Sequence, residues 1–187
     1  MNAIEVVESQ HREVEALFSE YESLGADSAE RKREIRQQIV ENLSRHAAME
    51  EQALYPTIVE VLPGFADKIE EELDEHQSVK EALATLQNLE PDDAEFDATL
   101  TKVIADVRGH VEEEERDLLP KLRGALDEEA LTSLGDALQG LWQMAPTHPH
   151  PETPNRPPFN VLAAPAVAIL DRVRDLVRDA TQGAKGK

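Results

Sequence analysis

Two stretches of the chain repeat a pattern of residues that could bind metal ions. In the first stretch, His46 is followed four residues later by Glu50. In the second, His110 is followed four residues later by Glu114, and one further histidine lies 35 or 34 residues before each stretch. Histidine nitrogen and carboxylate oxygen suit iron and other borderline divalent metals, and a carboxylate can bridge two cations. The repeat predicts a two-metal site whose ligands are His11, His46, Glu50, His76, His110 and Glu114.

These candidate ligands all fall on the apolar faces of predicted helices. His11 lies four residues after Val7 and three before Val14, a spacing that places the three side chains on one helix face. A glutamate four residues after a histidine shares that histidine's face in the same way. Burying a glutamate is costly unless it is paired or bound to a cation. A hydrogen-bonded core without metal is therefore the weaker explanation of the repeat.

Helices are the elements that would position these ligands. Apolar residues recur at intervals of three or four over residues 2–24, 29–61, 65–89 and 93–123, and glycine or proline separates these segments. The connections are short, so neighbouring helices should run antiparallel. Asp127 is placed to cap a fifth, shorter helix. The predicted fold is all-α: an antiparallel up-down-up-down four-helix bundle with an extra short helix.

The C-terminal part of the chain has a different composition. We expect residues 1–144 to form the bundle with its added fifth helix, and residues 145–160 to form an extended, proline-rich linker. Residues 161–187 should form a C-terminal amphipathic helix and a tail. This last helix mixes Asp with Arg, which disfavours membrane binding. We expect it to cover the bundle or to support self-association.

Composition excludes several classes of site and partner. The chain has no cysteine, so it has no disulfide and no thiolate metal site. Its formal net charge of −20 disfavours nucleic-acid binding, which needs a basic surface. No apolar run approaches the roughly 18 residues of a membrane span, and no signal segment opens the sequence. We therefore expect a cytoplasmic protein with neither nucleic acid nor membrane as a partner.

The repeated pattern resembles that of the haemerythrin-like, or HHE cation-binding, domain over about residues 2–124. Order, spacing and duplication of the motifs carry the resemblance, which rests on His11, His46–Pro56, His76 and His110–Pro120. It implies a four-helix bundle that holds two iron ions in a non-haem di-iron centre with an oxo or hydroxo bridge. The implied ligands are His11 and His46 for one iron, His76 and His110 for the other, and Glu50 and Glu114 as bridges to both.

The sequence departs from the oxygen-carrying haemerythrins in two places. Lys80 stands where those proteins have a further histidine, one turn after His76, and it should either reach solvent or pair with a carboxylate. In those proteins, the carboxylate ligand of the fourth helix lies five residues after the histidine ligand of that helix. The repeat here favours Glu114, which lies four residues after His110. Both irons would then be short of ligands, which favours reactions with peroxide or nitric oxide over reversible oxygen carriage. Candidates to fill the gap are Glu51, Tyr55 and Glu115.

Three functions are compatible with the sequence. The first is a di-iron protein that senses or turns over oxygen species (O2, peroxide or nitric oxide), including catalase-like peroxide removal. The second is a non-catalytic iron- or oxygen-binding module for storage or sensing. The third is a metal-free interaction bundle whose partner binds the C-terminal helix. Metal analysis separates the third function from the others, and peroxide turnover separates the first from the second.

Overall fold

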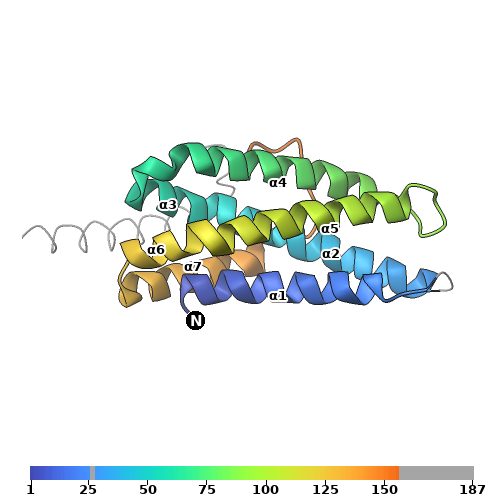
Figure 1. Cartoon of the computed structure of the whole chain (residues 1–187), viewed down its shortest axis with the longest axis horizontal. Helices are drawn as coiled ribbons and strands as arrows, with labels where there is room; N and C mark the ends of the chain where they lie inside the picture. The colour runs from blue at the N-terminus through green and yellow to red at the C-terminus, as the bar shows by residue number, and fades with distance from the viewer. Residues whose placement is uncertain (26–27, 156–187) are drawn as a thin grey trace, which may run out of the picture.

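Five helical segments make up the part of the chain that the computed structural model describes, residues 1–25 and 28–155 (Figure 1). The first is α1 (Ala3–Glu22), the third is α4 (Ala66–Leu86) and the fifth is α7 (Glu128–Met144). The second runs through α2 (Ala29–Met49), the π-helical turn η1 (Glu50–Leu54) and α3 (Tyr55–Val61), and a 3-10 turn, η2 (Pro63–Phe65), leads on to α4. The fourth runs through α5 (Phe96–Glu113), the π-helical turn η3 (Glu114–Leu118) and α6 (Leu119–Ala125).

The first four segments form the all-α, antiparallel four-helix bundle that the sequence predicts. α1 ends and α2 begins at the same end of the bundle at which α4 ends and α5 begins (Figure 1). α7 is the added fifth helix, and it packs along α1 and α2. Asp127 caps it, because the carboxylate accepts a hydrogen bond from the Ala130 N–H at 2.9 Å. None of the helices in the described residues is long and apolar enough to span a membrane.

Pro56 and Pro120 do not end their helices, because each lies just after a π-helical turn. A proline inside an α-helix cannot donate a hydrogen bond, and its ring collides with the carbonyl group four residues earlier. In η1 the Tyr55 N–H bonds instead to the Glu50 carbonyl, five residues back. η3 repeats this arrangement before Pro120. The wider turn accommodates each proline, and it begins at the glutamate of each repeat; such turns are frequent at functional sites.

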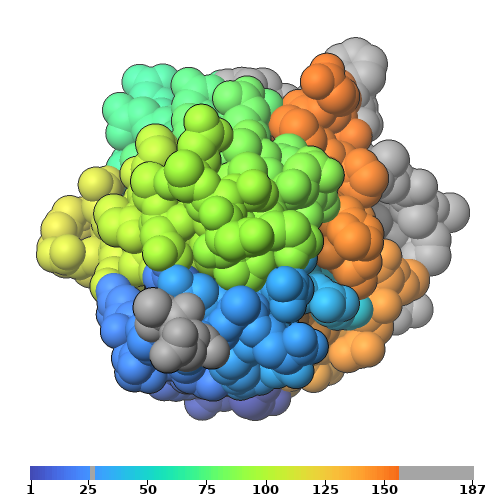
Figure 2. Space-filling view, turned by 90° about the vertical axis from the view of Figure 1, so that its right-hand side faces the viewer, coloured from blue at the N-terminus to red at the C-terminus, as the bar shows by residue number. Residues whose placement is uncertain are grey.

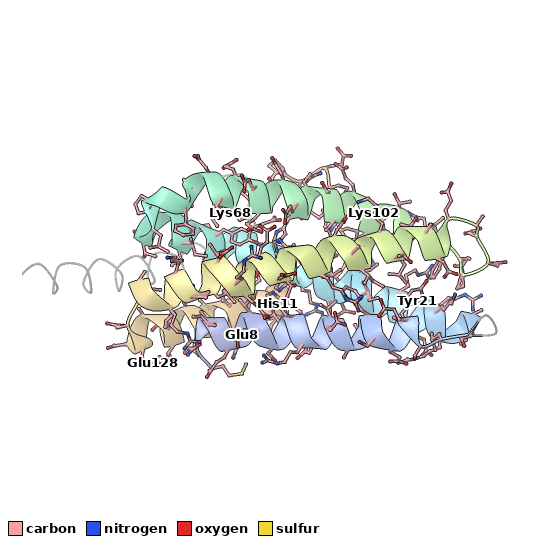
Figure 3. The ribbon with its side chains drawn as sticks, in the orientation of Figure 1. Glu8, His11, Tyr21, Lys68, Lys102 and Glu128 are labelled. Carbon is pink, nitrogen blue, oxygen red and sulfur yellow. The ribbon has the colours of Figure 1, made fainter. Side chains whose placement is uncertain are left out.

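Two apolar clusters fill the bundle and leave a polar layer between them. One cluster includes Ile4 and Ile58, and the other includes Phe18 and Leu100. The six candidate ligands belong to neither cluster. His11 lies near the middle of the bundle's length, whereas Tyr21 lies toward the end where α1 meets α2 (Figure 3). The apolar clusters thus hold the helices together on both sides of the layer that carries the candidate ligands.

Gly135 in α7 lets the N-terminus of α1 approach that helix closely. A Cβ added at position 135 would lie 2.7 Å from the carbonyl carbon of Asn2 and 2.9 Å from the backbone nitrogen of Ala3. Because these are backbone atoms, Gly135→Ala should push the two helices apart and lower the free energy of unfolding by about 1–3 kcal/mol, measured by urea titration. Gly140→Ala, where no atom lies within 4 Å of the new Cβ, is the control. Equal stability of the two variants would contradict the close approach.

Residues 145–155, the described part of the predicted linker, lie against the bundle. The Asn155 side chain donates a hydrogen bond to the Leu73 carbonyl at 2.8 Å. The Gln77 side chain donates to the Pro151 carbonyl at 3.1 Å. The segment, orange in Figure 2, therefore lies along one side of the bundle beside α4. The rest of the linker and the amphipathic helix predicted within 161–187 lie outside the described residues.

Candidate metal centre

The structure brings the six candidate ligands together in the polar layer. The histidines come from four helices: His11 from α1, His46 from α2, His76 from α4 and His110 from α5. Glu50 and Glu114 begin the π turns, and both are fully buried. In three groups, the ligand atoms lie within 4.8 Å of one another: His11, His46, Glu50 and Glu114; Glu50, His76 and His110; and Glu72, His110 and Glu114. The first two groups share Glu50, so each group could hold a metal ion beside this carboxylate.

The Nε2 atom of each histidine faces Glu50 or Glu114. The Nε2 atoms of His46 and His76 lie 3.1 and 3.4 Å from Oε2 of Glu50. Those of His11 and His110 lie 3.3 and 3.7 Å from Oε2 of Glu114. Each glutamate therefore lies between one histidine of the His11–His46 pair and one of the His76–His110 pair. Either carboxylate could therefore contribute to metal binding together with histidines of both pairs.

The other ring nitrogen, Nδ1, is hydrogen-bonded to an outer side chain in every histidine. The acceptors are Glu115 for His11, Gln10 for His46, Glu51 for His76 and Glu75 for His110, at 2.9, 2.9, 3.2 and 3.0 Å. Carboxylate and amide oxygens only accept hydrogen bonds, so Nδ1 of each ring carries a proton, and Nε2 offers a lone pair once the ring holds no second proton. Burial disfavours a charged His110, but the charge of Glu114 and the carboxylates of Glu72 and Glu75 beside its ring raise its pKa well above the ordinary value, so a metal would have to displace its second proton. Metal-binding histidines are typically oriented by such an outer acceptor. All four rings are thus held with the metal-binding nitrogen inward.

Several buried atoms of the layer have no hydrogen-bond partner among the described residues. They are Nε2 of His11 and of His46, both carboxylate oxygens of Glu50 and of Glu72, and Oε2 of Glu114. A buried polar atom left without a partner costs about 1–3 kcal/mol, and more if it is charged. These atoms present lone pairs to one another, and a shared cation satisfies lone pairs. The residues present therefore fit a bound metal.

Glu50 and Glu114 have opposite electrostatic environments in the metal-free protein. Burial and the charge of Glu114 raise the pKa of Glu50 well above its ordinary value. Burial also disfavours a charged Glu114, but the rings of His110 and His11 outweigh it and hold its pKa well below the ordinary value. Burial and the neighbouring His11 ring lower the pKa of His46, which favours the neutral ring that a metal requires. Without metal, these surroundings favour the protonated form of Glu50 and the charged form of Glu114.

Comparison with known proteins gives the family. A family model of the Hemerythrin HHE cation binding domain matches residues 2–122. The chain belongs to this family. An uncharacterized hemerythrin-like protein of Schizosaccharomyces pombe is 32% identical over 141 residues, which are 75% of this chain and 70% of that protein.

Two further matches concern a longer protein and a solved structure. A DNA nickase of Nostoc is 30% identical to this HHE-family chain over 129 residues, which are 69% of this chain but only 36% of the nickase. The crystal structure of a Hemerythrin HHE cation binding domain-containing protein from Mycobacterium kansasii has a TM-score of 0.66 at 21% identity. That match covers 77% of this chain and 86% of the other, and it shows the same fold.

Two further side chains of this HHE domain lie in the polar layer. The Tyr55 hydroxyl donates to Oε1 of Glu114 at 2.9 Å and lies 3.2 Å from Nε2 of His76. Glu72 is fully buried, with one oxygen 2.8 Å from Nδ1 of His110. Tyr55 was an open candidate in the sequence, whereas Glu72 was missed. Its signal was its position four residues before His76, one turn earlier on the same helix face.

Lys80 stands where the oxygen-carrying haemerythrins have a further histidine. Its side chain pairs with a carboxylate and does not reach solvent. Its Nζ lies 2.6 and 2.7 Å from the two oxygens of Glu51, and both side chains are buried. Glu51 in turn accepts the Nδ1–H of His76. Lys80 therefore contacts the centre through Glu51. On the other side, Glu114 faces inward and Glu115 contacts His11 from outside.

A small, partly enclosed pocket of about 20 Å³, called the closed pocket below, adjoins all four histidines of the HHE domain. A space of this size holds about one molecule the size of water. Apart from the histidines and Lys80, its lining is apolar: Val14, Leu43, Ala47, Val79, Leu83, Val107 and Val111. The centre thus has room for one small ligand on its histidine side.

Proposed function

We propose that the chain is a non-haem di-iron protein that reacts with or senses small oxygen species: dioxygen, peroxide or nitric oxide. The observation that carries the proposal is the position of Glu50 and Glu114, each between histidines of both pairs. Imidazole and carboxylate ligands suit iron, and two carboxylates between two cations offset much of their charge. When bound, the irons would supply a change of oxidation state and an open position for a small ligand. The ligands would be His11, His46, Glu50, His76, His110 and Glu114.

The chain's own residues determine what reaches the centre and which protons are held there. The apolar lining of the closed pocket disfavours ions and leaves no room for a large substrate. Burial and the charge of Glu114 raise the pKa of Tyr55 well above its ordinary value, so its hydroxyl keeps its proton. It can therefore donate a hydrogen bond to an anionic group beside it, as it does to Glu114. These features favour catalase-like removal of peroxide over oxidation of organic compounds.

The full chain purified after iron-replete expression should contain two irons, absorb in the near ultraviolet and release oxygen from hydrogen peroxide. Elemental analysis, an absorption spectrum and an oxygen electrode measure the three properties. Iron without peroxide turnover would favour the non-catalytic module for iron or oxygen storage or sensing. Less than one iron per chain, with none taken up on reconstitution, would contradict a di-iron centre and favour the metal-free interaction bundle.

Expectations about the protein's surroundings rest on the sequence and belong to the same proposal. They are a cytoplasmic location, no partnership with nucleic acid or membrane, and self-association through the helix predicted within 161–187. The domain boundaries near residues 145 and 161 are likewise predictions.

A further inference from the structure

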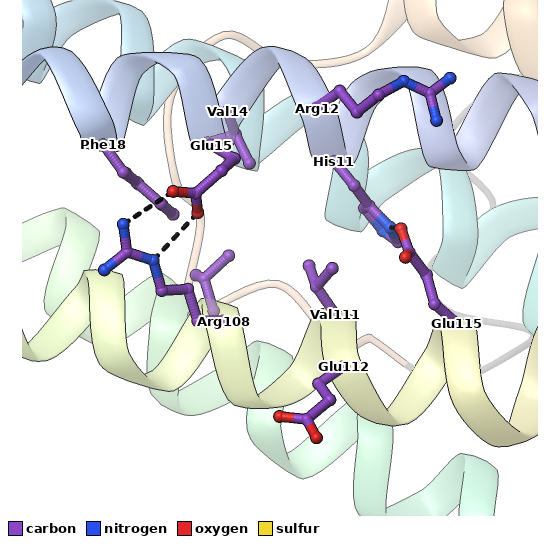
Figure 4. A pocket seen from close by; sticks show the side chains of 10 residues that line it. His11, Arg12, Val14, Glu15, Phe18, Arg108, Val111, Glu112 and Glu115 are labelled. Atoms are coloured by element: carbon purple, nitrogen blue, oxygen red, sulfur yellow. Dashed lines mark hydrogen bonds and ion pairs between the residues drawn. The ribbon is translucent and has the colours of Figure 1, made fainter.

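A cavity of about 450 Å³ opens to solvent between α1 and α5 (Figure 4). His11 and Glu115 lie at one end of it, and Val14, Val107 and Val111 form part of its wall. In Figure 4, Val14 and Val111 point from the two helices into the space between them, and Glu115 faces His11. The cavity is large enough for many water molecules, and it reaches a histidine of the candidate centre.

The outer cavity and the closed pocket are separated by one layer of side chains. Four residues line both spaces: His11, Val14, Val107 and Val111. Val14 and Val107 are buried, whereas Val111 is half-buried. A half-buried side chain has fewer neighbours to displace than a buried one when it moves. Val111 is therefore the member of the shared layer that can open most readily.

The chemistry of this passage selects small uncharged molecules. At the mouth, the guanidinium of Arg108 is neutralised by Glu15, with N–O distances of 2.7 and 2.9 Å. Glu115 is held by Nδ1 of His11. Arg12 and Glu112 also line the outer cavity, but both are exposed. The layer shared with the closed pocket consists of three valines and His11, and a charged molecule would lose its hydration there. Dioxygen, nitric oxide and hydrogen peroxide carry no net charge, and each is small.

A second space, of about 50 Å³, is a poorer passage. It lies under residues 146–154 and shares only Lys80 with the closed pocket. The buried ion pair between Lys80 and Glu51 lies between the two spaces, and opening it would leave both charges short of a partner.

We propose that the cavity between α1 and α5 is the route by which small uncharged molecules reach the metal centre, with Val111 as its gate. This inference rests on the proposed function, because it concerns access to the same centre. It assigns a role to the cavity between α1 and α5 and to Val111, which is not one of the proposed metal ligands.

Xenon tests the route without relying on iron chemistry, because it binds in dry apolar cavities. Crystals of the full chain under xenon pressure should show xenon in the closed pocket of the wild type. Val111→Trp should remove it, and Val111→Ala should keep it. Ala105→Trp, exposed on the same helix and lining neither space, is the matched control and should also keep it. If Val111→Trp does not fold, Val111→Phe replaces it.

The same variants, loaded with iron, give the kinetic test. Hydrogen peroxide should react about tenfold more slowly with Val111→Trp than with the wild type, and at least as fast with Val111→Ala, at equal iron content. No xenon in the closed pocket of the wild type, or an unchanged rate in Val111→Trp after xenon is displaced, would overturn the inference. If the wild type does not react with peroxide but the xenon pattern is as described, the proposed peroxide chemistry fails and the route stands.

Discussion

Glu50→Gln is expected to abolish the stabilisation that iron gives the wild-type protein. Glutamine keeps the shape of the side chain but removes the charge between His46 and His76, so the proposed centre would lose a carboxylate ligand. A ligand at a hundred times its Kd stabilises a folded protein by about 2.7 kcal/mol, or roughly 5–10 °C in Tm for a chain of this length. Thermal unfolding with and without iron measures this gain. We expect it in the wild type and in Glu13→Gln, an exposed position on α1, but not in Glu50→Gln.

Without metal, Glu50→Gln should be more stable than the wild type, and the difference in the free energy of unfolding should depend on pH. Because the pKa of Glu50 is raised on folding, its contribution to stability is complete below its ordinary pKa and is lost as the pH rises through the raised value. Glutamine does not ionise, so the stability of metal-free Glu50→Gln relative to the metal-free wild type should increase as the pH rises from about 5, just above the ordinary pKa of a glutamate. Urea titrations at several pH values measure the difference. A gap that stays constant as the pH rises would show that Glu50 is not protonated in the metal-free core.

The fold and the convergence of the six side chains both follow from the spacing of residues along the chain. Both could therefore be predicted from the sequence. Apolar residues at intervals of three or four define a buried helix face wherever they occur. His11 and His46 each follow an apolar residue at such an interval, so the bundle must bring their side chains inward. The repeat strengthens the prediction, because two helices carry the same pair of a histidine and a glutamate four residues apart on their buried faces.

The outer contacts could not be read from the sequence in the same way. Glu75 precedes His76 directly, yet its carboxylate accepts from His110 on the neighbouring helix. Gln10 and Glu115 meet their histidines only once α1 is packed against α2 and η3. In a chain with so many acidic residues, spacing alone does not show which of them turns toward a histidine. The π turns were a different case, since the repeated prolines were visible but their effect on the backbone was not.

Lys80→Met is expected to destabilise the protein strongly while weakening iron binding only slightly. Methionine leaves the buried Glu51 carboxylate without the ammonium group that lies 2.6 Å from it. Removing one partner of a buried ion pair typically costs about 3–5 kcal/mol. Glu51 still accepts the Nδ1–H of His76, so the ring keeps its orientation toward the centre. Urea unfolding and iron titration of the same preparation separate the two effects. Lys102→Met, which removes an exposed ion pair with Asp106, is the control and should change neither quantity appreciably.

Combining Glu51→Met with Lys80→Met should restore stability but weaken iron binding, because the side chain at position 51 then has no charge and no strong hydrogen-bond acceptor. Replacing both members leaves no uncompensated charge in the core, so most of the lost unfolding free energy should return. His76, however, loses the carboxylate that orients it, and iron affinity should fall by about 10–100-fold, the usual effect of removing such a partner. A single variant as stable as the wild type would mean that Lys80 does not compensate the charge of Glu51. A double variant with full iron affinity would mean that His76 does not depend on Glu51, and that this glutamate serves only as the counter-ion of Lys80.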